Sequence, residues 1–301
     1  MTKSEIEPYF PYATDLPHQD YLALDPISHS RLKNIDPTPA HFWAALKAED
    51  REVTPSMIMG TLVHSLVLGE SLDQRIAVEP ATYGPDGKKW NNNATECERW
   101  HERMKANGIL ALKKSEYDTV LGCATAVAMH PTCQSLLTAG APEVSFFGID
   151  AETDIPIKFR PDYMGRFNAI IDIKTVPPGG AAPEVFAKHA WDMGYVTQAA
   201  FYLDQYDAIY RKNTIDQFAS EPWASPKNTF VTIVVEKGSK EKGLPFALAV
   251  YEYDDVTLEK AREINFRRMR TLANCIETGE YPGYPSSVKV LSAPWWALAT
   301  N

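Results

Sequence analysis

The chain has 301 residues, of which 45% are hydrophobic and 23% are charged. These proportions are typical of a globular protein with one large domain or two modest ones, and they exclude extensive disorder and a coiled coil. The formal net charge of −9 argues against a partner made of phosphates, although net charge averages over surfaces that never meet a ligand.

Four scattered cysteines, at positions 97, 123, 133 and 275, include no Cys-x-x-Cys pair. This pattern gives no support to a disulfide framework, a zinc site or an iron–sulfur site, and it fits a reducing cytosol. No stretch approaches the ~20 consecutive apolar residues of a membrane span, and residues 1–20 lack the apolar core of a signal peptide. We therefore expect a cytoplasmic protein without a membrane partner.

The first part of the chain is predicted to be mainly helical. Two short helices, separated by a proline turn, are expected around residues 28–33 and 41–43. A firmer helix follows Thr54, a residue type common at N-caps, begins with Pro55 and continues to about Gly69. An exposed loop rich in Gly, Pro and Asn and two further helices are expected over residues 83–93, 96–106 and 115–129.

From residue 143 the hydrophobic period changes to two, which predicts strands. Three consecutive strands are expected over residues 143–149, 156–165 and 169–176. A long helix, two strands and a final helix follow over residues 183–210, 229–237, 246–254 and 257–279. This order predicts the α/β class, in an α+β arrangement with a mixed sheet flanked by helices and with helices added at the N-terminus.

An acid and a base lie two residues apart in an otherwise apolar predicted strand. Because side chains alternate along a strand, Asp172 and Lys174 share one face, whereas Ile171 and Ile173 share the other. Burying either charge without a partner costs several kcal/mol. A mutual ion pair or a polar outer face explains this pattern as well as a functional site does.

Asp162 favours the functional alternative, since it precedes Asp172 by ten residues with a turn signal between them. Two adjacent antiparallel strands can bring these carboxylates together, and an oxygen-rich site of this kind suits Mg²⁺ or Mn²⁺. Lys174 can then hold a water molecule or stabilise negative charge beside the metal. Phosphodiester hydrolysis needs such groups, but so short a pattern also arises by chance.

Two predicted helices carry further candidates. His64 follows Gly60 by one turn, where a missing side chain allows close approach to the sheet, and an imidazole can complete a carboxylate metal site. A lone helical histidine is nevertheless more often a core or boundary residue. Gln198 and Tyr202 share a helix face and can both hydrogen-bond a phosphate, although an ordinary amphipathic helix also explains them.

Taken together, five motifs resemble a known family. They are GTLVH at 60–64, Glu143, RPD at 160–162, DIKT at 172–175 and QAAFY at 198–202. In this order they resemble the RecB-like branch of the PD-(D/E)XK nucleases, and more narrowly the RecE-like exonucleases (exodeoxyribonuclease VIII, C-terminal domain) of phages and prophages. Residues 28–43, 234–254 and 278–297 also resemble that family, so the resemblance covers roughly residues 25 to 298.

The resemblance implies a restriction-endonuclease-like core and a role for each matching residue. The catalytic residues would be Glu143, Asp162, Asp172, Lys174, Gln198 and Tyr202. The metal ligands would be His64, Asp162, Asp172 and the backbone carbonyl of Ile173. Lys174 would position or activate the attacking water, and Gln198 and Tyr202 would contact DNA.

A single PD-(D/E)XK domain over residues 1–301 is the domain organisation that the resemblance implies. Within it we expect an N-terminal elaboration at 1–53, a nuclease core at 54–280 and a C-terminal tail at 281–301.

The implied activity is 5′-to-3′ digestion of one strand of linear duplex DNA with one or two Mg²⁺ or Mn²⁺ ions. Such an enzyme leaves a 3′ single strand for an annealing protein, and the family implies a ring-like homo-oligomer around the DNA. A structure-specific or endonucleolytic PD-(D/E)XK nuclease and a non-catalytic DNA-binding subunit remain as alternatives.

Basic residues near the aspartates are expected to bind DNA in spite of the acidic net charge. The expected DNA-binding residues are Lys158, Arg160, Arg166, Gln198 and Tyr202. In the predicted loop, Lys88 and Lys89 can contact phosphates, and Trp90 offers a stacking surface. The arginines of the last predicted helix are more typical of a solvated face.

Overall fold

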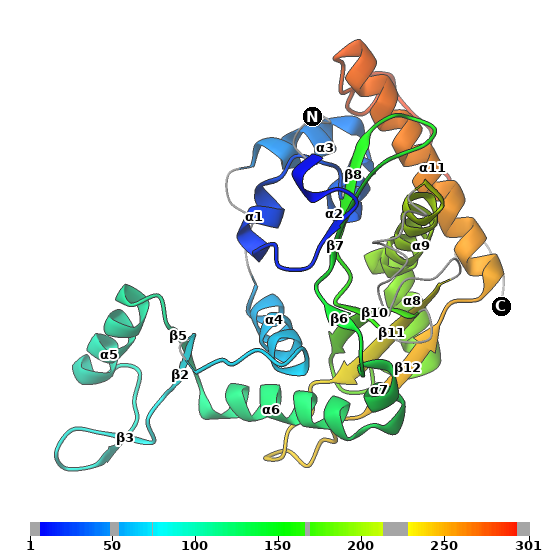
Figure 1. Ribbon diagram of the computed structural model, residues 1–301. Helices are drawn as coiled ribbons and strands as arrows, with labels where there is room; N and C mark the ends of the chain where they lie inside the picture. The colour runs from blue at the N-terminus through cyan, green and yellow to red at the C-terminus, as the bar shows by residue number, and fades with distance from the viewer. Residues whose placement is uncertain (1–6, 49–53, 74, 166–168, 213–227, 294–301) are drawn as a thin grey trace.

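A five-stranded mixed sheet forms the centre of the protein, seen in a computed structural model that describes residues 7–48, 54–73, 75–165, 169–212 and 228–293. Its strand order is β12-β11-β10-β9-β6. The strands are β6 (Ala141–Pro142), β9 (Tyr163–Met164), β10 (Ala169–Val176), β11 (Thr229–Glu236) and β12 (Leu248–Glu252). Only the β10–β11 pair is parallel, so the expected mixed sheet is confirmed (Figure 1).

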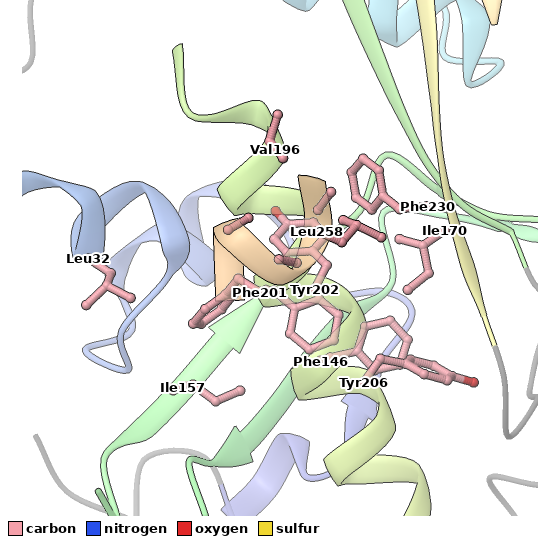
Figure 2. Close-up of a cluster of buried hydrophobic side chains, with 14 of the residues drawn as sticks. Leu32, Phe146, Ile157, Ile170, Val196, Phe201, Tyr202, Tyr206, Phe230 and Leu258 are labelled. Carbon is pink, nitrogen blue, oxygen red and sulfur yellow. The ribbon is translucent and has the colours of Figure 1, made fainter. Parts of the chain in front are cut away.

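Helices cover both faces of this sheet. One face packs against α8 (Pro183–Met193), α9 (Tyr195–Lys212) and α11 (Asp255–Thr278), and the other against α4 (Pro55–Val67) and α6 (Lys114–Met129), which leads into α7 (Pro131–Leu136). In β10, Ile170 and Val176 belong to the first core, shown in part in Figure 2, and Ile171 and Ile173 belong to the second. A strand that is buried on both faces is apolar almost throughout, which makes charged residues within it conspicuous.

A second, three-stranded sheet has the order β1-β7-β8, with β1 (Tyr12–Ala13), β7 (Ser145–Ile149) and β8 (Pro156–Phe159). The prediction of one strand over 156–165 within one sheet is therefore wrong. The chain leaves β8, passes through residues 160–162 without a strand, and enters the central sheet as β9. Pro161 explains the break, because it has no N–H for a ladder hydrogen bond and a fixed φ.

The predicted helices are present, with some differences. The short helices are α2 (His29–Leu32) and α3 (Pro39–Lys47), joined by the 3₁₀ turn η3 (Lys33–Ile35), and they follow α1 (His18–Ala23) and η2 (Glu7–Tyr9), which were not predicted. At the start of α4, the Thr54 hydroxyl accepts a hydrogen bond from the Met57 N–H, as an N-cap does. The long helix expected over 183–210 is instead two helices, because Gly194 takes a left-handed φ of 77° between α8 and α9.

Residues 75–112 form an arm that projects from the body of the protein (Figure 1). The arm contains β2 (Ile76–Val78), β3 (Thr82–Tyr83), β4 (Lys88–Lys89), α5 (Thr95–Ala106) and β5 (Leu110–Leu112). The loop predicted over 83–93 is therefore largely a short hairpin of β3 and β4. No helix in the described ranges combines the length and the apolar character that crossing a bilayer requires.

Candidate active site

Three polar side chains converge on the α9 side of β10. The Lys174 Nζ atom lies 2.7 Å from Asp172 Oδ2, and Gln198 donates from Nε2 to Asp172 Oδ1 at 3.0 Å. Lys174 also donates to Gln198 Oε1 at 3.4 Å, which closes a triangle of contacts between the strand and the helix. The expected ion pair therefore exists, and Gln198 is part of the same cluster.

Asp162, the residue just before β9, joins this cluster from the neighbouring segment. The antiparallel register pairs Tyr163 with Ile171, which brings Asp162 beside residues 172 and 173. Its Oδ2 atom accepts a hydrogen bond from the Ile173 N–H at 2.6 Å and lies 3.5 Å from Nδ1 of His64. The structure thus confirms that adjacent antiparallel strands bring the two carboxylates together.

Close packing of α4 on β10 brings His64 to this edge of the sheet. An ideal Cβ atom on Gly60 would lie 3.4 Å from the Thr175 hydroxyl, which is an ordinary van der Waals contact. Helix α4 thus lies against β10 at Gly60, but this approach does not require a glycine.

The charges of the cluster shift its pKa values in opposite directions. Burial alone would raise the pKa of Asp162, but the charge of His64 and its hydrogen bond lower it below the usual value. Burial raises the pKa of Asp172, and the Asp162 charge adds to this effect, so that together they outweigh Lys174. Of the two carboxylates, Asp162 thus stays ionised to lower pH.

The two cations of the cluster respond to the carboxylates. Burial alone would lower the pKa of Lys174, but Asp172 and Asp162 raise it above the usual value. Burial would likewise lower the pKa of His64, and Asp162 more than offsets this effect. Lys174 therefore stays cationic at neutral pH, and His64 is protonated more readily than a free imidazole.

The donor types of the cluster suit a hard divalent cation. Asp172 is 3% exposed, and its Oδ2 atom has only the ion pair with Lys174 and accepts no aligned hydrogen bond. Two carboxylates and a nearby peptide carbonyl are the oxygen ligands that Mg²⁺ and Mn²⁺ prefer. Within the described residues, however, no three His, Cys, Asp or Glu side chains converge as ligands of one ion. The ligand set of His64, Asp162, Asp172 and Ile173 therefore stays a prediction.

Glu143 supports the backbone of this region. Its N–H donates to the Asp162 carbonyl at 3.0 Å, and its Oε2 atom lies 3.5 Å from Nη1 of Arg160. The residue has a φ of 48°, a left-handed conformation that is uncommon for a side-chain-bearing residue. Its direct contacts thus stabilise the segment that positions Asp162, and the catalytic role implied for Glu143 stays a prediction.

The prediction that Lys158 binds DNA is wrong. This residue is 2% exposed, and its ammonium group donates to the carbonyls of Tyr21 and Leu24. Burial lowers the pKa of Lys158 to about 7. Nearness in sequence to Asp162 could not reveal that β8 is covered by residues 16–27 of the N-terminal segment.

Arg160 is likewise held inside the protein rather than offered to DNA. Its side chain is 6% exposed, its Nε atom donates to Ser145 Oγ, and its Nη2 atom donates to the Leu16 carbonyl, both at 2.8 Å. The guanidinium also lies 4.2 Å from the ring centroid of Tyr21. The DNA-binding role expected for Arg160 is therefore wrong, and Arg160 instead fixes the segment before Asp162.

Tyr202 is buried as well, and its hydroxyl donates to the Arg160 carbonyl at 3.2 Å. This contact corrects the expectation that Tyr202 touches DNA, because its one hydroxyl faces the protein interior. Gln198 is half-buried, and its DNA contact stays a prediction. Arg166 lies outside the described residues.

Sequence reasoning missed Tyr195, whose ring centroid lies 4.4 Å from the Lys174 Nζ atom. This cation–π contact helps to hold the ammonium group beside Asp172. A signal was present, because Tyr195 lies three residues before Gln198 and therefore on the same face of α9.

Comparison with known proteins agrees with this geometry. The family model described as "PDDEXK-like domain of unknown function (DUF3799)" matches residues 28–293. A crystal structure from Eubacterium rectale, titled "Putative exonuclease", is similar with a TM-score of 0.57 and 14% sequence identity, over 94% of this chain and 96% of that one. At this level of identity the likeness shows a shared fold. No curated protein matches the sequence. With most of its length matched, the chain belongs to the family of PDDEXK-like domains of unknown function and has the PD-(D/E)XK fold.

Proposed function

We propose that this protein is a metal-dependent nuclease that hydrolyses phosphodiester bonds of DNA. The observation that carries the proposal is the convergence of Asp162, Asp172 and Lys174 at one edge of the central sheet. The family and its fold support the same assignment, since the PD-(D/E)XK motif takes its name from these residue types. The similar crystal structure is described as that of a "Putative exonuclease", which agrees with this proposal.

Asp162, Asp172, the Ile173 carbonyl and His64 would hold Mg²⁺ or Mn²⁺, which when bound supplies Lewis-acid stabilisation of the phosphate charge. Lys174 is suited to bind the attacking water or a phosphate oxygen, because its raised pKa keeps it cationic at neutral pH. Gln198 fixes the Asp172 carboxylate and Lys174 relative to each other. These residues thus provide charge, water binding and orientation.

More narrowly, we propose an exonuclease that digests linear duplex DNA from 5′ to 3′ and leaves a 3′ single strand for an annealing protein. This narrower assignment, and a ring-like homo-oligomer around the DNA, rest on analogy with the RecE-like exonucleases that the sequence motifs resemble. Recombination by strand annealing would then use the product. An endonuclease, or a subunit that only binds DNA, would share the fold.

Digestion of linear and covalently closed duplex DNA of the same sequence, with Mg²⁺, separates these activities. An exonuclease releases nucleotides from the linear form and leaves the closed circle intact, because it needs an end. Blocking one 5′ end should then protect the strand that carries the block. Cleavage of the closed circle would assign an endonuclease, and binding of either form without turnover in Mg²⁺ or Mn²⁺ would assign a binding subunit.

A further inference from the structure

The arm of residues 75–112 projects from the body of the protein and contributes no side chain to the candidate active site as described above. Within the described residues, α5 packs on β5, and β3 pairs with β4. Neither α5 nor the β3–β4 hairpin packs extensively on the two large sheets or their helices (Figure 1). A folded element that contributes little to the core of its own protein is expected to contact something outside it.

Aromatic packing gives the arm a fixed internal structure. Trp90 lies edge-on to Trp100 at 5.3 Å between ring centroids, and Trp100 lies edge-on to His101 at 5.1 Å. The Trp90 indole donates to Asn92 Oδ1 at 2.6 Å, and His101 lies 3.4 Å from the carboxylate of Glu79. These contacts join the hairpin region to α5, so the arm can present its surface residues in a defined arrangement.

The root of the arm is attached to the helix that carries His64. Arg75, the first residue of the arm, donates to Ser65 Oγ at 3.2 Å and to Glu70 Oε2 at 2.8 Å. Ser65 directly follows His64, which reaches Asp162. The arm is therefore anchored to α4 at the residue that follows a side chain of the candidate active site.

The charge of the arm differs from that of the remaining chain. Its 38 residues carry six lysines and arginines and five acidic residues, a net charge of +1, so the other residues carry −10. The ion pairs of the arm involve Arg75, Lys88 and His101. Among the described residues, no carboxylate pairs with Lys89, Arg99 or Arg103, and all three are exposed.

We propose that the arm binds the phosphate backbone of duplex DNA and guides it to the active site. Exposed lysine and arginine side chains without carboxylate partners are groups that bind phosphates, and here they lie on a projecting part of an otherwise acidic protein. The hydrogen bond from Arg75 to Ser65 attaches the arm to the helix that carries His64. The inference rests on the proposed nuclease function, but the DNA contact is measurable without cleavage.

A triple variant with exposed cations replaced tests the proposal: Lys89→Ala, Arg99→Ala and Arg103→Ala. A matched control removes three exposed cations outside the arm: Lys188→Ala, Lys240→Ala and Lys242→Ala. Affinity for a labelled linear duplex is measured in Ca²⁺ at several salt concentrations. Each lost phosphate contact reduces the steepness of the plot of log affinity against log salt concentration by about 0.9. The slope of the arm variant should therefore be shallower by about 2 to 3, and the variant should bind at least tenfold more weakly. The control should retain the wild-type slope.

Hydrolysis of bis(4-nitrophenyl) phosphate with Mn²⁺ separates failure of this inference from failure of the proposed function, because this small ester does not extend to the arm. The arm variant should hydrolyse it at the wild-type rate. Wild-type affinity and slope in the arm variant would overturn the inference while leaving the nuclease assignment intact. Loss of a homo-oligomer on sedimentation, with DNA affinity unchanged, would assign the arm to a second copy and also overturn the inference. Weaker DNA binding by the arm variant, with no digestion of DNA by the wild type in Mg²⁺ or Mn²⁺, would support the inference about the arm and refute the nuclease assignment.

Discussion

Lys174 has three partners within the protein, namely the Asp172 carboxylate, the Gln198 carbonyl oxygen and the Tyr195 ring. A buried ion pair is by itself weak evidence for a functional site, because desolvation offsets much of the attraction. Here a second carboxylate, Asp162, lies beside the pair and faces a histidine. A structural ion pair needs no second carboxylate, so the cluster is better explained by cation and phosphate chemistry.

Gln198→Ala should lower kcat/KM for DNA by about ten- to a hundredfold. The variant removes a hydrogen bond to the Asp172 carboxylate and the acceptor for Lys174, and hydrogen bonds to charged groups contribute about 1.5–3 kcal/mol. Steady-state digestion of linear duplex DNA measures the effect. Gln205 lies about two turns further along α9. Gln205→Ala removes a hydrogen bond to the Asp150 carboxylate and serves as the matched control. Equal rates in wild type and Gln198→Ala would show that Gln198 has no such role.

The sequence predicted which residues of the cluster approach one another but not which nearby cations are buried. Asp162, Asp172 and Lys174 follow from strand alternation and a short turn, which are local properties. Lys158 and Arg160 are covered by the segment around Leu16 and Tyr21, more than 130 residues earlier in the chain. Contacts at such a separation leave no periodic signal in either segment.

At the scale of elements, β10 places the site because it is central in the sheet and buried on both faces. Its strand character was predictable from its alternation, and so was its helical covering. The division of 143–176 between two sheets was not predictable, because alternation reports buried faces and not strand partners. Pro161 and Gly194 were visible in the sequence, and their effects on strand and helix continuity became clear only from the structure.

The junction of α2 with α9 should make folding stability depend on pH. His29 accepts or donates a hydrogen bond with Thr197 Oγ1 at 2.9 Å, and burial lowers the pKa of His29 to about 3. Since the unfolded value is 6.5, the unfolded chain binds a proton more readily. The contribution of neutral His29 to the free energy of unfolding is therefore fully present above pH 6.5 and decreases as the pH falls. At pH 5 the free energy of unfolding should be lower by about 2 kcal/mol for this reason.

Urea unfolding of wild type and His29→Gln between pH 7 and 5 measures this contribution. Glutamine can keep a hydrogen bond to Thr197 but does not titrate, so the variant should lose less of its free energy of unfolding than the wild type as the pH falls. Carboxylates elsewhere contribute to both proteins and cancel in the comparison. Parallel pH dependence in the two proteins would show that His29 is not held neutral.

On the scale of the whole molecule, the net charge of −9 is distributed unevenly. The arm carries +1, and the active site contains two of the acidic residues that make up the surplus elsewhere. The initial argument from charge against a phosphate partner is therefore weak, because it averaged regions with different properties. Composition gave the protein class correctly. The loop at 83–93 and the helix at 96–106 were expected, but nothing in their sequence showed that they form an arm that projects from the body. The division into an elaboration, a core and a tail stays a prediction.

The central claim is that Asp172 acts in metal-dependent hydrolysis of DNA and does not serve only to pair with Lys174. The most direct test is nucleotide release from linear duplex DNA by the wild type and Asp172→Asn, with Mg²⁺, after chelation, and after Mg²⁺ is restored. The substitution keeps the shape of the side chain and removes its charge, and circular dichroism checks that the variant is folded. We expect release by the wild type that stops on chelation and returns with Mg²⁺, and a loss of at least a hundredfold in Asp172→Asn. Equal release by a folded Asp172→Asn protein, or release that continues without a divalent ion, would contradict the account.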